Sequence, residues 1–186
     1  MFDEDIKIAS PDAIKALSSK RKPPKSPLSE EYDRETAKGN TVKALEVGST
    51  LAHDVVENIN RFALENEDGG NTEMATQRGI LMVFAATVAI ENDITSSVVA
   101  QAAKNEFNSE LEKIDPTLYK AVGDSGAFSF YYLAYRRGTE VDRRIGQTFA
   151  MLCSHDGDPI FHELGEAIYC WFLSKSVKRI KNSGIE

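Results

Sequence analysis

The stretch that decides the fold is Ile80-Leu81-Met82-Val83-Phe84-Ala85-Ala86-Thr87-Val88-Ala89-Ile90, the longest apolar run in the chain, interrupted only by Thr87. In a helix through this run, apolar side chains occupy nearly every face: one stripe holds Leu81, Phe84, Ala85 and Val88, and the other faces hold Ile80, Val83 and Ile90. A helix of this kind belongs in the centre of a domain. The run has eleven residues, whereas a bilayer core requires about 20. We therefore expect a buried core helix over about 72–92, not a membrane span.

Helical start and stop signals repeat on both sides of this run. The expected helices cover about 29–38, 41–67, 95–114, 116–122, 125–137, 139–152 and 159–181. Predicted N-caps include Ser29, Thr95, Thr139 and Asp158. Nowhere does the sequence show the period-two alternation that is typical of a strand. The sequence therefore predicts an all-α, single-domain bundle of about six to eight helices around the central helix.

Four glycines fall inside these expected helices: Gly48, Gly79, Gly146 and Gly165. A glycine inside a helix costs roughly 0.5–1 kcal/mol relative to alanine. We expect the close approach of another helix, or of a ligand, to offset that cost.

Composition limits the class of protein. With 186 residues, 41% apolar and 27% charged, the chain is typical of one globular domain. Its net charge of −7 disfavours nucleic acid as a partner, because such binders carry an excess of Lys and Arg. Cys153 and Cys170 lie among apolar residues and are predicted to be buried thiols. The acidic start, residues 1–5, does not resemble a secretory signal. We therefore expect a cytoplasmic protein that does not bind a membrane.

Residues 1–28 differ from the rest and are predicted to form a flexible basic arm, with the helical domain over 29–186. Ser10-Pro11-Asp12 indicates a short helix to about Lys20. The following segment, 20–27, holds three prolines and four cations, which favours an extended linker. The spacing of Arg21, Pro24 and Pro27 also fits a polyproline ligand.

The densest chemistry lies in residues 154–166, which hold two of the three histidines and four carboxylates. His155, Asp156, His162 and Glu166 are a possible ligand set for a divalent metal, and Glu163 is a possible base. The pattern is not H-E-x-x-H, because the fifth residue is Glu. A structural alternative explains much of the segment, with Asp158 as N-cap and Pro159 as first helical residue.

The second constellation, residues 128–144, is rich in aromatic side chains and arginines. Its candidate ligand or interface residues are Tyr131, Tyr132, Tyr135, Arg136 and Arg137. A face rich in Tyr suits a wet pocket or a subunit interface. Arginines beside aromatic rings can also hold an anionic ligand.

Three functions remain open from the sequence. The leading expectation is a protein that acts by self-association or by binding a protein partner, without catalysis and without a cofactor. One alternative is a metal-dependent hydrolase or lyase that uses the segment from His155 to Glu166. The other is a small anionic-ligand binder that uses residues 128–144.

Overall fold

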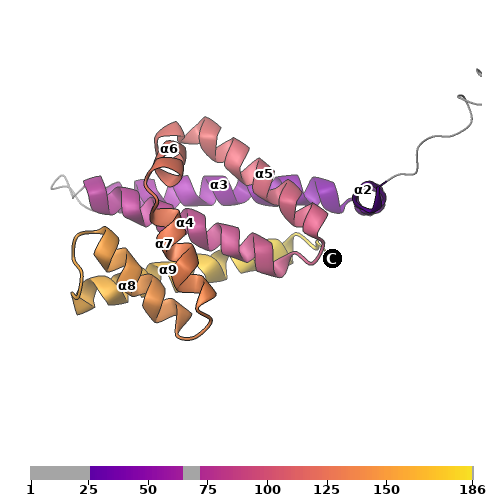
Figure 1. Ribbon diagram of the computed structural model, residues 1–186. Coiled ribbons are helices and arrows are strands. Elements are labelled where there is room, and N and C mark those ends of the chain that lie inside the picture. Colours follow the sequence, from indigo (N-terminus) through magenta and orange to yellow (C-terminus); the bar gives the residue numbers. More distant parts are fainter. Residues whose placement is uncertain (1–25, 65–71, 186) are drawn as a thin grey trace, which may run out of the picture.

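The computed structural model describes residues 26–64 and 72–185, and these form helices without any strand. In chain order the helices are α2 (Pro27–Ala37), α3 (Asn40–Leu64), α4 (Thr72–Asp93), α5 (Ser97–Ile114), α6 (Pro116–Asp124), α7 (Ala127–Arg136), α8 (Val141–Leu152) and α9 (Pro159–Asn182). Figure 1 shows α3, α4 and α9 running lengthwise through the molecule, with α2 seen end-on beside the start of α3. The predicted all-α bundle is confirmed.

Helix α4 is the centre of the bundle, as its composition predicts. From Ile80 to Ile90 every side chain except that of Thr87 is buried. The ring of Phe84 lies 5.3 Å from that of Phe128 and 6.3 Å from that of Tyr169, measured between ring centres. By length and composition alone, residues 73–93 could also cross a membrane, a property that the core helix of a soluble protein shares.

The helices approach one another closely at the four mid-helix glycines. Helix α3 packs along α5, and α9 packs along both α4 and α8. A Cβ atom on any of these glycines would come within 3.0 Å of another helix. The atoms in the way belong to Ala103 for Gly48, Leu118 for Gly79, His162 for Gly146 and Phe149 for Gly165. The expectation that another helix approaches closely at each glycine is confirmed.

Two of the helices begin with an aspartate cap, as predicted for Asp158. The Asp158 carboxylate accepts a hydrogen bond from the Ile160 N–H at 2.9 Å, and Asp115 accepts from the Leu118 N–H at the same distance. Each is followed by a proline at the first helical position. Proline suits this first helical position, because the N–H that it lacks would have no partner within the helix.

Three predicted caps are wrong. Helix α2 begins after Ser26, whose hydroxyl accepts from the Ser29 N–H at 3.2 Å. Ser96 rather than Thr95 caps α5. At α8 the Thr139 hydroxyl instead accepts from Arg144 at 3.2 Å.

The boundary predicted between residues 28 and 29 falls inside helix α2. Pro27 and Leu28 already form its first turn, because Ser26 caps the helix three residues earlier than predicted. Residues 1–25, which contain the rest of the predicted arm and its short helix, lie outside the described part of the chain.

Candidate interaction site

Helix α7 presents two faces with different surroundings. Gly126 before the helix has φ = 66°, and Gly138 after it has φ = 74°. A glycine in the left-handed conformation therefore lies at each end of α7. Ala127, Tyr131 and Ala134 are buried against α4 and α8. Around the rest of the helix, Phe130, Tyr132 and Leu133 are 49, 41 and 61% exposed. Three large apolar side chains therefore meet solvent on one ten-residue helix.

The candidate Tyr131 is not on this outward face. Its side chain is 0% exposed, and its ring centre lies 5.6 Å from that of Phe84 on α4. Burial raises the pKa of the Tyr131 hydroxyl, which has no hydrogen-bond partner among the described residues. The prediction of Tyr131 as an accessible ligand or interface residue is wrong, because its edge of the helix turns toward the core.

Tyr132 and Tyr135 lie on either side of the boundary between these faces. The guanidinium of Arg136 stands 5.4 Å from the centre of the exposed Tyr132 ring, in cation–π geometry. Tyr135 is half-buried, and its hydroxyl accepts from the Asn92 amide on α4 at 2.7 Å. Tyr132 and Arg136 are therefore available to another molecule, whereas Tyr135 serves mainly to attach α7 to the bundle.

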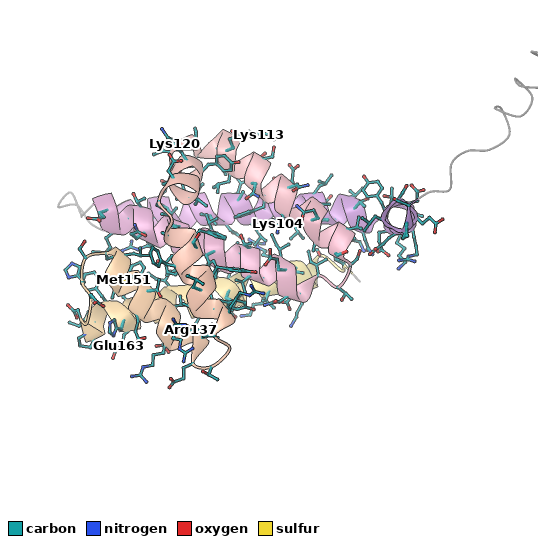
Figure 2. The ribbon with its side chains drawn as sticks, in the orientation of Figure 1. Lys104, Lys113, Lys120, Arg137, Met151 and Glu163 are labelled. Carbon is teal, nitrogen blue, oxygen red and sulfur yellow. The ribbon has the colours of Figure 1, made fainter. Side chains whose placement is uncertain are left out.

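On the side toward α8, α7 borders a hollow of about 180 Å³. Its lining includes Arg137, Arg144, Met151 and Asp156. Figure 2 labels Arg137 and Met151 on this part of the molecule. Two residues that the sequence placed in different constellations, Arg137 and Asp156, thus line one hollow. Of the nearby arginines, Arg143 pairs with Glu140 at 3.4 Å.

The candidate metal ligands do not form one set. The His155 ring stacks on that of Phe161 with the ring centres 3.7 Å apart. His162 Nε2 is buried without a hydrogen-bond partner in the described part of the chain. Glu163 is exposed at the start of α9, and Glu166 packs beside Gly146. Within residues 26–64 and 72–185, no three His, Cys, Asp or Glu side chains are placed to share one ion.

The two thiols have different surroundings. Cys153 is buried as predicted, but Cys170 is exposed, because it lies on the outer side of α9. Desolvation raises the pKa of the Cys153 thiol to about 11. Desolvation, together with the nearby Asp142 carboxylate, raises the pKa of Cys170 to about 11 as well. Neither thiol has the low pKa of a reactive cysteine.

The sequence did not reveal a groove of about 720 Å³ between α4, α5 and α6. Along α4 it is lined by Val83, Thr87 and Glu91, and along α5 by Lys104, Asn108 and Glu112. These residues recur every four positions, so each set forms one stripe of its helix. No local signal marks such a groove, because its walls come from separate helices.

Comparison with known proteins adds no information on function. The chain matches no protein-family model, and no curated protein or solved structure is significantly similar to it.

Proposed function

We propose that the protein acts by self-association through the outward face of α7, defined here as Phe130, Tyr132, Leu133, Arg136 and Arg137. The observation that carries this proposal is the exposure of three large apolar side chains on a helix of ten residues. Clustered exposed apolar side chains mark interaction sites. Protein interfaces are also enriched in aromatic residues and arginine relative to the rest of the surface.

A second copy of the chain is the partner that this face fits. In a two-fold interface the same helix meets itself, so that antiparallel α7 helices contact each other. With Leu133 on the two-fold axis, Phe130 stands opposite Arg136 of the second copy, because both lie three residues from the axis. Two equivalent cation–π contacts then flank a Leu133 pair. Each such contact is worth about 0.5–2 kcal/mol, depending on its desolvation.

The competing functions have weaker support. The hollow beside Arg137 measures about 180 Å³, whereas small-molecule sites usually measure about 300–1,000 Å³. The hydrolase alternative requires His155 and His162 near one ion, and these side chains lie in different surroundings. The proposed setting is the cytoplasm, with an acidic surface that keeps the protein soluble.

Sedimentation velocity over the micromolar range tests the proposal. The wild-type chain should change from monomer to dimer as its concentration rises, and Leu133→Asp should remain monomeric, since the charge would be buried without a partner. Leu28→Asp is the matched control, because Leu28 on α2 is 64% exposed and Leu133 is 61% exposed. A wild-type protein that stays monomeric, or dimers that survive Leu133→Asp, would refute this use of α7.

A further inference from the structure

The groove between α4 and α5 has a closed end and an open end. At the closed end Lys104 Nζ lies 2.7 Å from Glu91 Oε1, which joins the two helices. Figure 1 shows α5 diverging from α4 beyond this point, with α6 across the wide end. Figure 2 labels Lys104 near the closed end and Lys120 on α6. The groove is thus a wedge that widens from the α4–α5 turn toward α6.

The lining of the groove suits an amphipathic helix. Tyr119, Val122 and Phe128 supply apolar surface, and Glu112, Lys120 and Asp124 stand around it. The α4 stripe from Val83 to Glu91 spans eight residues, or about 12 Å of helix. Grooves of this kind accept the apolar side of a helix whose anchors recur at three- and four-residue steps.

The N-terminal segment of the same chain has the matching sequence. A helix over residues 11–20, as the Ser10-Pro11 signal predicts, is about 15 Å long. Ala13, Ile14 and Leu17 would share one side of it. Residues 11–25 contain five cations and one carboxylate, so this segment is basic in a chain that is acidic overall.

The described chain begins close to the closed end of the groove. Glu31 on α2 accepts a hydrogen bond from the Ser96 hydroxyl at 2.8 Å. From Ser96 to Lys104 is eight residues of α5, about 12 Å. A second hollow of about 270 Å³ occupies this interval and shares Glu91 and Lys104 with the groove. Residues 21–25, extended at about 3.1 Å per residue, add about 15 Å of reach beyond Ser26.

We propose that residues 11–20 bind as an amphipathic helix in the α4–α5 groove, with Ile14 and Leu17 toward Val122 and Phe128. The linker fixes the direction, because Lys20 must lie nearest Ser26 and therefore nearest Glu91. Asp12, at the other end of this helix, then lies toward Lys120, and Lys15 lies toward Glu112. The order of charges along the segment complements their order along the groove. The groove is therefore covered by its own chain, independently of the α7 interface.

Hydrogen exchange of the full-length chain, followed by mass spectrometry, tests this proposal. We expect the backbone amides of residues 13–20 to exchange at least about tenfold more slowly than in an unstructured peptide of the same sequence. Asn108→Arg places a bulky cation in the groove and should abolish this protection. Leu17→Asp, which changes the N-terminal segment instead of the groove, should also abolish this protection. Asn105→Arg is the matched control: Asn105 is exposed on the same helix, outside the groove, and its variant should retain the protection.

Each other outcome contradicts the proposal. Exchange of residues 13–20 at the unstructured rate in the wild-type chain would show that the groove is open to another ligand. Protection that survives Asn108→Arg would place the segment elsewhere. Protection that disappears on dilution in the Leu133→Asp background would show that the segment of a second copy fills the groove. Hydrogen exchange in α4 and α5 serves as the internal check that every variant remains folded.

Discussion

The carbonyl oxygen of His162 on α9 lies directly against Gly146 on α8, with no room for a side chain between them. One helical turn further along α9, Gly165 makes a similar approach to Phe149 on α8. Together the two glycines allow the backbones of α8 and α9 to pack at close range. The α8–α9 loop next to this packing carries Asp156, which lines the same hollow as Arg137.

Gly146→Ala should therefore destabilise the fold. Alanine is favoured over glycine in a helix by about 0.8–1 kcal/mol, but a forced contact in a packed interior costs about 1–3 kcal/mol. Because the obstacle is backbone, we expect a net loss of about 1–2 kcal/mol in the free energy of unfolding by urea. Gly123→Ala is the control: it lies in α6 with open space around its Cβ position. That change should stabilise the protein by about 0.4–1 kcal/mol. Equal effects of the two substitutions would contradict the close α8–α9 contact.

Phe84→Ala should be the most damaging single truncation of the core. Phe84 is 1% exposed and lies against the rings of Phe128, Tyr131 and Tyr169. Removing a buried phenylalanine costs about 3–5 kcal/mol, because a cavity remains. Phe130→Ala on the outward face of α7 should change the free energy of unfolding by less than about 0.5 kcal/mol in dilute solution. A loss below about 1 kcal/mol in the free energy of unfolding for Phe84→Ala would contradict the central position of α4 in the bundle.

Features that depend on neighbouring residues could be predicted from the sequence. The all-round apolarity of residues 80–90 requires burial wherever the other helices lie, and Asp158-Pro159 carries its cap chemistry within two residues. The Ser and Thr caps at Ser29, Thr95 and Thr139 were wrong. Short runs here offer several hydroxyls or carboxylates, and the choice among them depends on the path of the chain before the helix.

Features that depend on distant residues could not be predicted. Tyr131 and Tyr132 are adjacent in sequence, but only the position of α4 decides that the first is buried and the second exposed. Asp54 on α3 is buried, and Lys175 and Arg179 on α9 compensate its charge at 2.9 and 3.0 Å from the carboxylate. No periodicity links residues 125 positions apart. The groove was missed for the same reason.

The raised thiol pKa of Cys170 predicts slow modification in spite of its exposure. With a pKa of about 11, roughly one thiol in a thousand is ionised at pH 8, and only the thiolate reacts. Titration with a disulfide reagent at pH 8 should show one slow thiol in the folded protein and a second only after unfolding. Asp142→Asn removes a carboxylate that disfavours the thiolate, so Cys170 should react faster. Asp156→Asn should leave the rate unchanged, and an equal acceleration by both variants would exclude the role of Asp142.

Glu35 should make stability depend on acid pH. Its carboxylate is buried beside the Asn40 amide, which donates a hydrogen bond at 2.7 Å, and Lys38, at 3.2 Å. The Asn40 hydrogen bond and the Lys38 charge lower the pKa of Glu35 from its ordinary value of 4.5. Because the pKa is lower in the folded than in the unfolded state, the ionised carboxylate stabilises the fold fully above pH 4.5. This contribution decreases as the pH falls through the folded-state pKa.

Urea unfolding of the wild-type chain and of Glu35→Gln, measured from pH 7 to pH 3, should show this dependence. The variant should be less stable at pH 7, and the difference between the two proteins should shrink once the pH falls below about 4.5. Asn40→Ala removes the main donor and should flatten the pH dependence of the chain that keeps Glu35. A difference between wild type and Glu35→Gln that stays constant down to pH 3 would mean that the effect of the substitution comes from packing and not from the charge of Glu35.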